Sequence, residues 1–308
     1  MTDPPAKSAG LYLLLASLTL TPWSSPARAL LLGMLVGLVL GQPYVRQSKK
    51  LSGLLLRACV VLLGFTMNFG VVLRVGLNGL GLAVLTIGIT FALGAMLGRL
   101  LRVPARTSLL ISAGTAICGG SAIAAVGAVC EAEESEMTVS LATIFLLNAL
   151  ALYLFPPIGL SLHLSQIDFG VWSGIAIHDV SSVVGAASSY GPVALETATA
   201  VKLSRALWIA PLALLVARIY RKQAGKGAFP WFILLFMLAS ASRAVWPWLQ
   251  SLSPFIGAVS RAGLGLSLFL IGSGLSPQML RNVGWRALAE GLLLWLFVSL
   301  LSLGAVLG

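Results

Sequence analysis

Long apolar runs separated by short polar stretches fill almost the whole chain from Leu11 to Gly308. Most runs reach about 20 residues, the length that an α-helix needs to cross the hydrocarbon core of a membrane. The pattern predicts nine spanning helices, at residues 10–23, 27–42, 51–70, 77–99, 136–156, 194–217, 229–249, 254–274 and 284–306. Two more segments, near 106–131 and 169–190, are apolar but interrupted. We therefore expect an all-α membrane protein with a single transporter-like domain over residues 1–308, and ten or eleven spans if the interrupted segments cross.

Composition agrees with this pattern. The chain is 58% hydrophobic and 9% charged, with a mean hydropathy of +0.98, outside the range of soluble domains. The net charge of +11 comes from basic residues in short loops, which indicates membrane topology rather than nucleic-acid binding. Three loops carry these groups: Arg46, Lys49 and Lys50; Arg99, Arg102 and Arg106; Arg218, Arg221, Lys222 and Lys226. Counting crossings places all three loops on one side, taken as cytoplasmic, with the N-terminus inside and the C-terminus outside.

The first 30 residues allow two interpretations. Lys7, the run Leu11–Leu20 and Ala27-Arg28-Ala29 are typical of a cleavable secretory signal, but they also fit a retained first helix. We expect the helix to be retained.

The two interrupted segments are related to each other. GTAICGGSAIAAVGAV (114–129) aligns without gaps with GIAIHDVSSVVGAASS (174–189) at an offset of 60, matching Gly114 with Gly174 and Ser121 with Ser181. A second similarity joins residues 61–76 to residues 269–284, on helices predicted to run in opposite directions. Together these similarities predict an inverted-topology repeat.

The interruptions suggest a binding site, because a broken helix in lipid leaves backbone groups that protein or a wet cavity must satisfy. Gly119-Gly120 is expected to end one half-helix, and Ser121 to cap the next. In the second copy Asp179 with Ser181 and Ser182 would play these parts. Two half-helix N-termini facing each other would bind an anion. Each segment could cross the membrane or re-enter, with re-entry favoured, and a packing notch in a continuous helix is the structural alternative.

Ionisable residues within the predicted spans are the next candidates. Lys202 and Arg205 share one helix face and could balance a bound anion, or pair with Asp179, Glu196 or Glu136. His178 and Asp179 could carry a coupled proton, or act as a helix cap with a hydrogen-bonded histidine.

Other polar residues have simpler interpretations. Asn148 is expected to face the bundle interior, and Arg286 and Glu290 to form an intrahelical pair. The run Glu131–Glu136 has no metal-ligand spacing and fits a solvated face. Motifs for ATP-driven transport, zinc hydrolysis or a nucleophile elbow are missing from the sequence, so we expect neither an enzyme nor a bound metal.

Four motifs in register resemble the YeiH-type sulfate-exporter family of bacterial membrane proteins: ICGGSAIAA (117–125), SLATIFLLNALALYLFPPIG (140–159), IHDVSSVVGAA (177–187) and VKLSRALWIAPL (201–212). The resemblance implies a multi-pass inner-membrane protein related to cation/proton antiporters and bile-acid symporters. It also implies functional roles for the following residues: Cys118, Gly119, Gly120, Ser121, His178, Asp179, Ser181, Ser182, Lys202 and Arg205.

The functional expectation is a secondary transporter of a small inorganic or organic anion, such as sulfate or a sulfonate-derived ion, working by alternating access. H⁺ or Na⁺ would be the coupling ion, with no other cofactor; the partners would be lipid and a second copy of the chain, not nucleic acid. One alternative is a cation/proton antiporter with Asp179 and Glu196 as ion ligands. The other is a membrane scaffold or receptor without transport.

Overall fold

The computed structural model describes residues 6–21, 26–70, 73, 80–220, 231–246, 248–274, 277 and 284–308. Within these ranges every regular element is helical, and five helices are long and apolar enough to cross a membrane: Ala83–Leu100, Glu134–Ser161, Pro192–Ile219, Trp248–Ser273 and Trp285–Leu307. Shorter apolar helices accompany them. The predicted all-α membrane class is confirmed, while the count of nine full spans stays a prediction. Arg221, Lys222, Lys226 and parts of the segments 61–76 and 269–284 lie outside the described residues.

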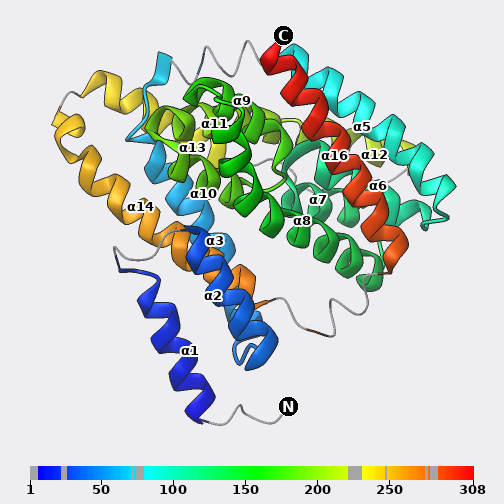
Figure 1. Cartoon of the computed structure of the whole chain (residues 1–308), viewed down its shortest axis with the longest axis horizontal. Coiled ribbons are helices and arrows are strands. Elements are labelled where there is room, and N and C mark those ends of the chain that lie inside the picture. The colour runs from blue at the N-terminus through cyan, green and yellow to red at the C-terminus, as the bar shows by residue number, and fades with distance from the viewer. Residues whose placement is uncertain are drawn as a thin grey trace. The chain divides into compact units, whose positions relative to one another are not determined.

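The chain forms two compact units, and the predicted single domain stays a prediction. Unit 1 holds α1 (Ala6–Leu18), α2 (Pro26–Val39), α3 (Val45–Gly64), α13 (Trp231–Val245) and α14 (Trp248–Ser273) (Figure 1). In this unit α14 packs along α2 and α3. Glycines allow the close approach, because a methyl group on Gly272 would lie only 2.6 Å from the Leu30 carbonyl oxygen. Ser267 then donates a 3.0 Å hydrogen bond to the Ser52 carbonyl.

Unit 2 contains both interrupted segments. Its helices are α5 (Leu80–Leu100), α6 (Ala105–Ala113), the π-helical turn η1 (Gly114–Cys118), α7 (Gly120–Val129), α8 (Glu134–Ser161), α9 (Gln166–Ala176), α10 (Val180–Tyr190), α11 (Pro192–Ala206), α12 (Ile209–Ile219) and α16 (Trp285–Leu307). Helices α5 and α16 are in contact and lie side by side in Figure 1. Helices α9 and α11 pack closely because Gly170 and Gly174 leave room for Thr197 and Val201.

The helix predicted over 194–217 is divided, which corrects the sequence-based expectation. Helix α11 ends at Ala206 and α12 begins at Ile209. Pro211 explains the division, because it lacks the amide hydrogen that would bond the carbonyl of Leu207. The two pieces still follow one another in a single apolar span.

The first interrupted segment is a helical hairpin, formed by α6, η1 and α7. A methyl group on Gly114 would lie 3.0 Å from Ile123, and one on Gly127 would lie 3.5 Å from Leu110. In a straight helix the second pair would be about 25 Å apart along the axis. The chain therefore turns back on itself, at Gly119.

The second interrupted segment, α9 and α10, is also a hairpin. The rings of Phe169 and Tyr190 stack with centroids 3.8 Å apart, although 21 residues of straight helix would separate them by about 31 Å. The Tyr190 hydroxyl donates to the Leu164 carbonyl at 2.7 Å, which closes the open end. Its turn lies at Ile177–Asp179.

Helix α8 connects the two hairpins. Its 28 residues extend for about 42 Å, so the open ends of the two hairpins lie at opposite ends of this helix. The residues that start the returning helices, Gly119 and Asp179, are 60 positions apart, as in the sequence alignment. The continuous-helix alternative is therefore wrong at Gly119-Gly120, and both segments are hairpins. Re-entry of these hairpins into the membrane stays a prediction.

Candidate functional site

The tips of the two hairpins meet inside unit 2. A methyl group on Gly119 would lie 3.5 Å from the carbonyl carbon and oxygen of His178, and 3.4 Å from the side chain of Ile144 on α8. Gly119 has φ 64° and ψ −126°, a conformation that essentially only glycine adopts. This residue therefore permits both the reversal and the close contact with the other tip.

Helix α11 ties both tips through its two buried cations. Lys202 Nζ donates a 2.5 Å hydrogen bond to the carbonyl of Ile177, where α9 ends. Arg205 Nη2 donates to the carbonyl of Ala116 in η1, and its Nη1 donates to Thr86 Oγ1 at 2.7 Å. Both carbonyls lie at C-terminal ends of half-helices, where partial negative charge collects. Lys202 and Arg205 are thus placed to stabilise the broken backbone of both tips.

Three amide groups of the second tip, those of His178, Asp179 and Ser181, are bonded within the protein. Asn148 Oδ1 on α8 accepts from the amides of His178 and Asp179, each at 3.1 Å. Asp179 caps α10, because its carboxylate accepts from the amide and hydroxyl of Ser181. The predicted capping role of Asp179 is confirmed, and a substrate would not find these amides free.

The first tip differs, which corrects the role predicted for Ser121. Gly119, not Ser121, precedes α7, and no side chain caps this helix through its N-cap residue. Cys118 lies beside the first turn, with its sulfur in reach of the Ala122 amide and the Ser121 hydroxyl. Gly120 and Ser121 are the first two residues of α7, and the first amides of a helix have no partner within that helix. Gly120 is half-buried and Ser121 is exposed.

Polar atoms without partners gather around the tips. Both ring nitrogens of His178, Thr115 Oγ1 and Asn148 Nδ2 are buried and have no hydrogen-bond partner among the described residues. Such groups are rare in native proteins and often indicate a ligand or water site. Thr115 was not predicted from the sequence; neither was Thr86, whose role depends on packing between α5 and α11. A hydroxyl residue four positions before Gly119 in an apolar run was the available sequence signal for Thr115.

The formally charged groups at the tips are two basic side chains and one carboxyl group. Lys202 lies within electrostatic range of Asp179 and Cys118, and two cations against one carboxylate leave one positive charge when Lys202, Arg205 and Asp179 are ionised. The C-terminal ends of the half-helices are bonded by the cations, and the start of α10 is bonded by Asp179. The first turn of α7 contains no acidic residue, and no side chain caps it, so no carboxylate offsets the positive end of this helix there.

Two other residues predicted for the site, Glu196 and Ser182, are placed as follows. Glu196 is half-buried in the second turn of α11, six residues and about 9 Å along the helix before Lys202. Ser182 is buried in the first turn of α10.

The acidic run after α7 caps α8, since the Glu136 carboxylate accepts from the Glu133 amide at 2.9 Å. Over the described ranges, His, Cys, Asp and Glu form no group that could hold a metal ion.

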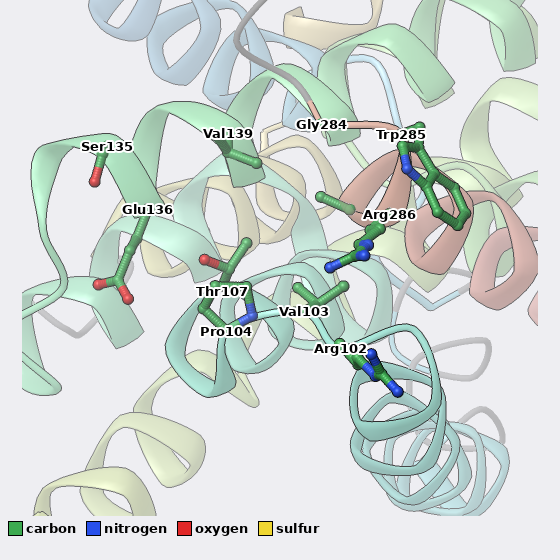
Figure 2. A pocket seen from close by; sticks show the side chains of 11 residues that line it. Arg102, Val103, Pro104, Thr107, Ser135, Glu136, Val139, Gly284, Trp285 and Arg286 are labelled. Carbon is green, nitrogen blue, oxygen red and sulfur yellow. The ribbon is translucent and has the colours of Figure 1, made fainter.

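A separate pocket of about 440 Å³ lies where α6, α8 and α16 begin (Figure 2). Arg102 and Arg286 line one part of it, and Ser135 and Glu136 line another. A second pocket of about 300 Å³ lies between α5, α6 and α12 and includes Arg99. The starts of α6, α8 and α16 and the ends of α5 and α12 therefore gather at one end of unit 2.

Comparison with known proteins identifies relatives over nearly the whole chain. The family described as "Conserved hypothetical protein 698" matches residues 7–291. A UPF0324 membrane protein of Bdellovibrio bacteriovorus is 45% identical over 95% of this chain and 92% of its own length. Another, from Geobacter sulfurreducens, is 44% identical over 96% of both chains. No solved structure matches the chain. The chain therefore belongs to the Conserved hypothetical protein 698 family, which is YeiH-like and includes the UPF0324 membrane proteins.

Proposed function

We propose that this protein is a secondary transporter that binds a small anion between the two hairpin tips. The observation that carries the proposal is the start of α7, which has no side-chain cap, is exposed at Ser121 and lies at the tip that Arg205 bonds. A half-helix N-terminus at the centre of a membrane protein is a site where transporters bind anionic groups. Sulfate or a sulfonate would suit this site, because its oxygens accept hydrogen bonds from backbone amides.

The arrangement of the hairpins supports transport by alternating access. The two hairpins enter from opposite ends of α8 and share a 60-residue repeat, as in an inverted-topology repeat. Each hairpin would cover the site between the tips from one end of α8. With nine spans and two re-entrant hairpins in a bacterial inner membrane, the N-terminus would lie in the cytoplasm and the C-terminus outside. The helix ends that carry Arg99, Arg102 and Arg218 would then face the cytoplasm.

Lys202 has a double role in this proposal. It bonds the Ile177 carbonyl with one of its three donors and lends positive charge to the site. His178 and Asp179 are the candidates for carrying a coupling proton, because both lie at the second tip and the histidine nitrogens are unpartnered among the described residues.

The test is a thermal-shift titration of the purified protein in detergent. Sodium sulfate, sodium methanesulfonate and sodium chloride are compared at matched ionic strength, and sodium chloride is compared with choline chloride to measure the effect of sodium itself. An anion that occupies the site at 100 times its Kd stabilises the native state by about 2.7 kcal/mol. Uptake of labelled sulfate into liposomes that contain the protein then tests transport itself.

Asn148→Asp provides the matched variant, because aspartate retains an oxygen acceptor for the two amides at the second tip and adds a negative charge. We expect this variant to fold and to lose the anion-dependent shift. If anions have no effect, while sodium stabilises the wild type and Asp179→Asn removes that effect, the protein is a cation/proton antiporter. Absence of any substrate-dependent flux from a folded protein would indicate the scaffold or receptor.

A further inference from the structure

A buried carboxyl group lies outside the hairpin tips, on α16. Glu290 is fully buried, and its Oε1 accepts a 2.5 Å hydrogen bond from the Ser108 hydroxyl on α6. Its Oε2 has no hydrogen-bond partner among the residues described. The intrahelical pair predicted with Arg286 is wrong, because the Arg286 guanidinium lies over the Trp285 ring at 5.7 Å and lines the pocket of Figure 2. A buried carboxylate without a counter-charge is costly, so this group needs a bound cation.

The Ser108 hydroxyl is placed to serve two protonation states. Its oxygen lies 2.5 Å from Glu290 Oε1 and 3.1 Å from the Gly94 carbonyl oxygen, but the hydroxyl has only one hydrogen to donate. When Glu290 is ionised, Ser108 donates to the carboxylate. When Glu290 is protonated, the carboxylic acid donates to the Ser108 oxygen, and the serine hydrogen turns to Gly94. Both states keep the same heavy-atom positions.

Glycines on α5 hold the serine against the carboxyl group. A methyl group on Gly98 would overlap the Ser108 hydroxyl and lie 3.4 Å from Glu290 Oε1. A methyl group on Gly94 would overlap Ser112, one turn further along α6. The hydroxyl and the carboxyl group therefore lie directly against the backbone of α5.

A route to water leads through Ser108. This residue lines the 300 Å³ pocket between α5, α6 and α12, together with Gly98, Arg99 and Ser112. Glu290 itself does not line that pocket. A proton that leaves the carboxyl group passes to the serine oxygen, while the serine hydrogen passes to a pocket water, so protons balance at each transfer.

Other ionisable groups on the helices around α16 leave Glu290 without an ion pair. These groups are Arg99 on α5, Arg106 on α6, Cys118 in η1, Glu134 and Glu136 on α8, Asp168 on α9 and Arg286 on α16. Within the part of the chain that the structure describes, none of them bonds the carboxyl group, and Ser108 alone does. A metal ion would need several oxygen ligands, whereas a proton needs only one, so a proton is the cation that fits this site.

We propose that Glu290 and Ser108 form a proton-binding site that exchanges with the pocket between α5, α6 and α12. The site is separate from the hairpin tips and goes beyond the anion site proposed there. It provides a second position at which the protein takes up and releases a proton.

Infrared difference spectroscopy of the purified protein tests the site without any anion. Spectra are compared between about pH 5 and about pH 9, a range that covers buried carboxyl groups. The wild type should show the carbonyl-stretch band of a titrating, buried carboxylic acid. Glu290→Gln should lose this band, whereas the control Glu134→Gln, which removes an exposed carboxyl group, should retain it.

Ser108→Ala gives an independent readout. Loss of the hydroxyl should shift the frequency of the same band, because the carboxylic acid loses its acceptor. A wild-type band that survives in Glu290→Gln, or a band unchanged in Ser108→Ala, overturns the proposal. If Glu290→Gln does not fold, the Ser108→Ala spectrum decides alone. Because no anion is present, failure of the anion site leaves this result unchanged.

Discussion

Replacing Gly119 by alanine tests whether the first hairpin tip needs glycine for its backbone conformation or for the space around it. The nearest atoms to a new methyl group would be the Ile144 side chain at 3.4 Å and the His178 carbonyl at 3.5 Å, so there is room for it. The cost comes from φ 64° and ψ −126°, which an alanine avoids. Such conformations cost about 1–3 kcal/mol per residue.

Gly120→Ala is the matched control at the next position. A methyl group on Gly120 would meet Leu141 at 3.4 Å, similar space to Gly119, but Gly120 lies in α7 with negative φ. Alanine gains up to about 1 kcal/mol over glycine in a helix, less in its first turn. We therefore expect Gly119→Ala to be about 2 kcal/mol less stable than Gly120→Ala, a factor of about 30 in the folded-to-unfolded ratio.

Unfolding of both variants in detergent, followed by circular dichroism during an SDS titration, measures the difference. The anion-dependent thermal shift is measured on the same samples, and it should be weaker in Gly119→Ala, because relief of the backbone strain moves the Gly120 and Ser121 amides. Equal stability of the two variants would refute the reasoning, since it would mean that the chain does not need glycine where it turns.

Three further substitutions test individual contacts. Lys202→Met leaves the Ile177 carbonyl without its donor and should cost about 1–3 kcal/mol, whereas Arg218→Met, at an exposed position with the same charge change, should cost under about 0.5 kcal/mol in the same SDS titration. Asn148→Leu removes the acceptor of two buried amides and should destabilise the fold by about 2–5 kcal/mol; a melting temperature equal to that of the wild type would contradict the hydrogen bonds described. Gly98→Ala should displace the Ser108 hydroxyl and alter the infrared band of the buried carboxyl group, while Gly88→Ala on the same helix, which meets nothing within 4 Å, should leave the band unchanged.

Much of the site could be predicted from local sequence patterns. Glycine or a capping aspartate within an apolar run indicates a broken helix, and Gly119 and Asp179 do start the returning helices. The three-residue spacing of Lys202 and Arg205 correctly placed both on one helix, where both are buried. These features depend on helix geometry and on the cost of unpaired groups in lipid, which a sequence shows directly.

The partners of these residues could not be predicted in the same way. Lys202 and Arg205 bond main-chain carbonyls, and Glu290 bonds a serine from another helix instead of Arg286 four positions away. Which acceptor reaches a buried cation depends on long-range packing, here on glycines that bring α9 against α11 and α5 against α6. Ser121 was wrongly given the cap, because the reversal takes place at Gly119.

The hydrogen bonds of Lys202 and Arg205 on α11 couple the positions of the two hairpin tips. Lys202 and Arg205 are one turn apart on a single rigid helix, and each holds the carbonyl of a different tip. A slide of α11 along its axis by one residue, about 1.5 Å, would stretch both bonds together. The two hairpins would then move together rather than independently. The opening of one hairpin alone would not release a solute held between the tips.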